Sequence, residues 1–312
     1  MIFATFTFHK YILLIMKESI LKPVIFSILC ASILVSCGDE PKPKKKVDEV
    51  VFDETNPLHA IFDDKIFSIP SPVQTGYLIK QLDLTFDKML LNSEANVNSY
   101  VAEHKQALNL GIYGTDLGYS SLYNQKSTSM SYLNSIEKLT AQLGLDAAFD
   151  TNFLSKFENN NGNEDEMIQL MSQSFKKADN FLKNANRKTT SALILSGGWV
   201  ESIYLACELN RKKSNDEIKR RIGEQKQSLV SIIELLKEYN VDSKNDELIV
   251  QLEDLEISFD KIEMTYEYEA PETDKEKHLT TFNHSFSVEF NQSVVDEITE
   301  KVKAIRNSIT KA

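Results

Sequence analysis

Hydrophobic positions recur every three or four residues through most of the chain, a spacing typical of amphipathic helices. The clearest series alternates between four and three residues and comprises Ile218, Ile222, Gln225, Leu229, Ile232, Leu236 and Tyr239. Similar series run through 248–266 and 295–309. Helices with alternating spacing meet at shallow angles, as they do in bundles. The pattern therefore predicts an all-α, multi-helix bundle.

About nine helices are expected from this periodicity and from the helix-stop signals. Their expected ranges are 73–92, 97–125, 127–143, 146–157, 163–185, 189–210, 214–239, 248–266 and 295–309. Gly144 is expected to end the third helix, because glycine readily takes the left-handed conformation found there. Residues 277–288 are rich in Thr, Phe and Ser, which indicates one small hairpin or an ordered loop.

The N-terminal part of the chain does not follow the helical pattern. Lys17 and Lys22 precede an apolar run, 24–35, that is typical of a secretory signal and too short for a membrane-spanning helix. Leu34-Val35-Ser36-Cys37 follows directly. A second apolar patch precedes Met16, so a start at Met16 gives a more ordinary signal and the same mature chain.

The tetrapeptide ending at Cys37 resembles the lipobox of bacterial lipoproteins. In that family the cysteine thiol receives a diacylglycerol, the peptide is cut before the cysteine, and the new amino group is acylated. The resemblance implies a signal peptide over 1–36 and lipidation of Cys37. The alternatives are a plain membrane anchor or a chance match.

Residues 37–56 are predicted to be a flexible tether. They contain prolines and lysines over 41–46 and four acids after them. Such a segment cannot bury enough apolar surface to offset its ordering entropy. Its lysines either stay solvated or bind anionic headgroups. The remaining residues, 57–312, are expected to form a single all-α domain.

Composition and charge limit the classes of partner that the protein is expected to bind. The net charge is −11 and only five arginines occur, which argues against nucleic acid as a partner. After cleavage and lipidation Cys207 is the single free cysteine, and its apolar surroundings predict a small buried hydrophobe. The histidines lack a dense ligand spacing, although His278 and His284 flank one loop. We therefore expect no metal, no cofactor and no assigned catalytic residue.

Two expected helices are apolar nearly all round, around 108–123 and 192–205, which is typical of central helices. Gly114 and Gly118 lie one turn apart and leave a stripe without side chains. Gly197 and Gly198 do the same in the other helix or produce a kink. These two helices are therefore expected to cross closely at the centre of the bundle.

Acidic residues interrupt both apolar helices. A buried carboxylate must be paired, hydrogen-bonded or protonated, which singles out Asp116, Glu201 and Glu208. With the neighbouring aromatic residues they suggest a candidate pocket lined by Tyr113, Asp116, Tyr119, Trp199 and Glu201. The group either binds a ligand, forms a catalytic carboxylate pair, or makes a satisfied polar contact that fixes the helix register.

The lipobox, the GIYGTDLGY segment at 111–119 and the SGGWVES segment at 196–202 together resemble Bacteroidota lipoproteins with an all-helical body and no characterised activity. The resemblance implies lipid anchoring in the cell envelope, at the outer membrane, on its periplasmic face or at the cell surface. We expect a non-enzymatic protein that binds an envelope protein or a small molecule. The alternatives are an envelope enzyme or a small-molecule or metal carrier with a central pocket around Asp116 and Glu201.

Overall fold

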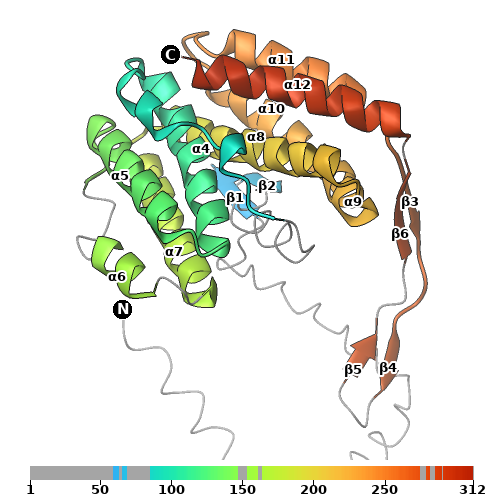
Figure 1. Cartoon of the computed structure of the whole chain (residues 1–312). Helices are drawn as coiled ribbons and strands as arrows, with labels where there is room; N and C mark the ends of the chain where they lie inside the picture. The colour runs from blue at the N-terminus through green and yellow to red at the C-terminus, as the bar shows by residue number, and fades with distance from the viewer. Residues whose placement is uncertain are drawn as a thin grey trace, which may run out of the picture. The chain divides into compact units, whose positions relative to one another are not determined.

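The computed structural model describes residues 59–62, 65–68, 85–146, 153–160, 164–274, 279–281, 285–289 and 291–311. Nine α-helices lie in these ranges: α4 (Glu103–Leu122), α5 (Lys126–Gln142), α6 (Phe153–Asn160), α7 (Glu164–Asn184), α8 (Lys188–Lys212), α9 (Asp216–Glu224), α10 (Lys226–Tyr239), α11 (Asp246–Phe259) and α12 (Gln292–Thr310). The predicted all-α, multi-helix class is therefore confirmed for these ranges (Figure 1). The predicted signal peptide, Cys37 and the predicted tether lie outside them.

Helices α4 and α8 form the centre of the bundle. Helix α8 packs against α4, α7, α9, α10 and α12, whereas α4 also contacts α5. Every residue of α4 from Ala107 to Leu122 is buried. Among the described helices, α8 alone has the length and composition of a membrane span, but 94% of its most apolar stretch is buried inside the fold. This burial is typical of a core helix.

Two glycines allow α4 and α8 to approach closely. A methyl group added at Gly111 would overlap the carbonyl oxygen of Ile194 and lie 2.6 Å from the nitrogen of Gly198. One added at Gly197 would overlap the carbonyl group of Leu108. The prediction that these two helices cross closely at glycines is therefore correct for the helix pair.

Of the two glycines named on α4 for this crossing, Gly114 and Gly118, the first was wrong and the second stays a prediction. A methyl group at Gly114 would overlap the ring of Phe175 in α7, so this glycine makes room for an aromatic side chain of another helix. On α8 the prediction named Gly197 and Gly198, and both lie at the crossing. Hydrophobicity gave no means of choosing among the three glycines of α4, because the whole segment is apolar.

The helix expected over 73–92 is not present in its described part. Residues 85–87 are irregular and are followed by two 3-10 helices, η1 (Lys88–Leu90) and η2 (Glu94–Asn98). The side chain of Asp87 accepts a hydrogen bond from the Met89 nitrogen at 2.8 Å. Such local side-chain bonds compete with the α-helix. The remaining residues of that prediction, 73–84, lie outside the described ranges.

Of the other predicted helices, one is divided and one ends earlier than predicted. The expected helix 214–239 is divided into α9 and α10 at Gln225, and Asn215 caps α9 through bonds to the nitrogens of Glu217 and Ile218 at 2.8 and 3.2 Å. The expected helix 248–266 stops at Phe259. Its last residues instead belong to a strand.

Short antiparallel pairs account for the described strands. Strand β1 (His59–Phe62) pairs with β2 (Lys65–Ser68), which lies against α10. Strand β3 (Glu263–Glu267) pairs with β6 (Ser285–Glu289), and β4 (Glu272–Asp274) pairs with β5 (Leu279–Thr281). The hairpin expected within 277–288 is therefore misplaced, because β5 and β6 do not pair with each other but with strands from 263–274.

We predict that Gly111→Ala destabilises the protein although alanine is the better helix former by about 1 kcal/mol. The added methyl group meets the α8 backbone, and overpacking costs typically about 1–3 kcal/mol. Asn134→Ala, at an exposed position of α5, is the control and should be neutral or slightly stabilising. Urea unfolding of both variants measures the difference, and a more stable Gly111→Ala protein would contradict the close crossing.

Candidate functional site

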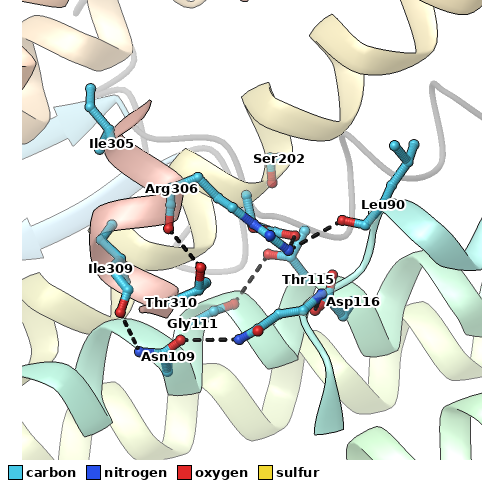
Figure 2. Close-up of polar contacts among 12 residues, drawn as sticks. Leu90, Asn109, Gly111, Thr115, Asp116, Ser202, Ile305, Arg306, Ile309 and Thr310 are labelled. Carbon is cyan, nitrogen blue, oxygen red and sulfur yellow. Dashed lines mark hydrogen bonds and ion pairs between the residues drawn. The ribbon is translucent and has the colours of Figure 1, made fainter. Parts of the chain in front are cut away.

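A buried ion pair joins α8 to α12. Arg306 donates from Nε to Glu201 Oε2 at 2.9 Å and from Nη2 to Glu201 Oε1 at 3.1 Å. The side chains are 10% and 0% exposed. Arg306 Nη2 also donates to the Leu90 carbonyl oxygen at 3.2 Å (Figure 2). The two parallel bonds are the forked geometry in which a guanidinium binds a carboxylate most strongly.

The electrostatics of Arg306 favour its charged form. Burial alone would lower the pKa of this guanidinium, but Glu201 and Asp116 together raise the pKa above its ordinary value. The guanidinium also lies over the ring of Tyr204, 4.7 Å from its centroid, a position in which aromatic rings attract cations. Arg306 is therefore a permanent positive charge in the interior.

Asp116 completes this group from α4. Its Oδ2 accepts a hydrogen bond from the Asn92 nitrogen at 3.1 Å, whereas its buried Oδ1 accepts from none of the described residues. Burial raises the pKa of Asp116 well above its usual 3.8, the nearby Glu201 raises it further, and Arg306 opposes the shift. We infer that Asp116 is protonated, which would let it donate to the nearby Glu201 carboxylate and give its unsatisfied Oδ1 a partner.

Asn92 connects this group to its surroundings. Its backbone nitrogen binds Asp116, and its Nδ2 donates to Tyr100 Oη at 3.0 Å and to Asn109 Oδ1 at 3.1 Å. Its carbonyl oxygen accepts from Tyr132 Oη at 2.8 Å. These bonds fix the irregular segment before α4 to α4 and α5.

The C-terminal end of α12 is attached to the same network. Carbonyl groups in the last turn of a helix have no intrahelical partner. Three of them accept bonds instead: Ile309 from Asn109 Nδ2 at 3.2 Å (Figure 2), Ser308 from Lys105 Nζ at 2.5 Å and Thr310 from Tyr100 Oη at 3.2 Å. The position of α12, and with it that of Arg306, is therefore fixed from α4.

Two tyrosines of the candidate pocket bind backbone groups. Tyr113 donates to the Ser93 carbonyl oxygen at 2.9 Å, and Tyr119 Oη accepts from the Asp87 nitrogen at 3.1 Å. Both side chains are buried, and burial is the largest cause of their raised pKa values. Tyr119 also stacks on Phe86 at a centroid distance of 5.2 Å. Their hydroxyl groups therefore hold the 85–100 segment in place.

The other polar residues predicted on α8 have separate partners. Trp199 donates from Nε1 to Gln225 Oε1 at 3.3 Å, at the junction of α9 and α10. Glu208 forms an ion pair with Arg211. Burial raises the pKa of the Cys207 thiol to about 12, so the thiol stays protonated at neutral pH. Of the five predicted pocket residues, Asp116 and Glu201 therefore lie near each other, whereas the hydrogen bonds of the other three lead to separate groups.

Sequence reasoning did not identify Arg306, Asn92 or Asn109 as members of the site. Arg306 lies four residues after Val302 and three before Ile309, within the apolar stripe of α12. That position was the available signal, because a charged residue on a buried stripe needs a partner. Asn109 similarly lies between two leucines of α4. Asn92 gave no such signal, since it lies in an irregular segment.

The described part of the chain contains no group of three or more His, Cys, Asp and Glu side chains that could hold a metal ion. His278 and His284 lie outside it. Chemically, Asp116 and Glu201 are two neighbouring carboxyl groups beside one fixed cation, and the nearby Glu201 helps to raise the pKa of Asp116. No known protein family, curated protein or solved structure matches this chain.

We predict that Asp116→Asn stabilises the protein at neutral pH. The amide keeps the shape and can still donate to Glu201. In the parent protein the raised pKa of Asp116 favours folding below about 3.8. At higher pH the unfolded chain loses this proton while the folded protein keeps it. The advantage of the variant should therefore grow above pH 4 by up to about 1.4 kcal/mol per pH unit. Urea unfolding between pH 4 and 8 tests this, and a difference independent of pH would contradict it.

Arg306→Met should destabilise the protein by about 3–5 kcal/mol, because it leaves the Glu201 carboxylate buried without its cation. Adding Glu201→Gln should restore part of this loss, since a neutral amide costs less to bury. The control is Lys237→Met, which breaks the exposed pair with Glu253 and should cost at most about 1 kcal/mol. Chemical unfolding measures the free energy of unfolding of each variant. Equal losses for Arg306→Met and Lys237→Met would show that the buried pair stabilises the fold no more than an exposed pair does.

Proposed function

We propose that this chain is a lipid-anchored protein of the cell envelope whose helical body binds a partner and carries out no reaction. The proposed lipid anchor is supported by the sequence Leu34-Val35-Ser36-Cys37, which follows an apolar segment typical of a signal. The acylated Cys37 would hold the protein at the outer membrane. The following tether, 38–56, would let the body reach partners at some distance from the lipid surface.

The contacts of the central acids support binding over catalysis. Glu201 is paired with Arg306 through both carboxylate oxygens, and Asp116 Oδ2 accepts a hydrogen bond from the Asn92 nitrogen. Three of the four carboxyl oxygens thereby have partners within the protein, as structural polar groups do. A reacting group must instead come within hydrogen-bonding distance of its substrate. This arrangement supports a structural role for both acids and favours a binding surface on the exterior.

An envelope enzyme or a small-molecule carrier is the second candidate. It is favoured by the raised pKa of Asp116, since perturbed acids gather at functional sites. The Asp116→Asn variant separates the candidates. Under the proposed function the variant keeps its partner and gains stability, whereas a carrier or enzyme that uses this acid would keep its fold and lose ligand binding.

Cys37→Ser should abolish incorporation of a labelled fatty acid and release the protein from the membrane fraction. The replaced thiol is the atom that receives the diacylglycerol in lipoproteins of this type. Cys30→Ser is the matched control, because Cys30 lies within the signal and its loss should leave labelling intact. Continued labelling of the Cys37→Ser protein would contradict the assignment of Cys37 as the lipidated residue.

The side of the outer membrane on which the helical body lies can be measured directly. Asp39 and Glu40 follow Cys37 and resemble part of the acidic surface-export signal of Bacteroidota lipoproteins, although Pro41 and Lys42 interrupt it. Protease treatment of intact cells separates the alternatives. Digestion of the body would place it at the cell surface, and protection would place it on the periplasmic face.

A further inference from the structure

We draw no further inference here: the strongest candidate, the exposed face of the β3–β6 strand pair that carries Met264 and Tyr266, supports no proposal because nothing in the structure shows what covers it.

Discussion

The carboxylate of Glu201 lies in the middle of the bundle with none of its surface exposed, and the bound guanidinium of Arg306 makes this burial tolerable. An ionised carboxylate without such a partner would be too costly to bury. The pair imposes a geometric condition on the fold. Helix α12 must lie where Arg306 reaches α8, and its last turn is held there by Lys105, Asn109 and Tyr100.

Protonation of Asp116 follows from the same constraint. One cation beside two carboxyls can balance only one negative charge, and in a low dielectric the second charge is strongly disfavoured. A neutral acid that donates to Glu201 satisfies both groups. Such a network contributes less net stability than a well-packed apolar replacement often would. We therefore interpret it as a device that fixes the relative positions of α4, α8 and α12, a hypothesis that the Asp116→Asn and Arg306→Met variants address.

Much of the helical architecture could be predicted because burial imposes a period on each helix. Val295, Ile298, Val302, Ile305 and Ile309 were expected on one face of α12, and all five are buried. Where the observed helices differ from the predicted ones, the causes are local and are not visible in the hydrophobic pattern. Asp87 and Asn215 cap short helices through their side chains, and Gln225 separates two helices whose apolar stripes are continuous in sequence. Periodicity also located Asp116 and Glu201 as acids that require partners, but it could not identify the partner, because Arg306 lies 105 residues away.

The strand β3 shows where a local pattern is insufficient in principle. Phe259, Ile262 and Tyr266 continue the spacing of α11, so they fit a helix, but Met264, Tyr266 and Tyr268 fit the two-residue period of a strand equally well. Pairing with β6, eighteen or more residues further along, is what distinguishes the two. As a helix, this segment would direct its aromatic residues to several sides. As a strand it turns Met264 and Tyr266 to one face and leaves glutamates on the other, a division that only the register with β6 reveals.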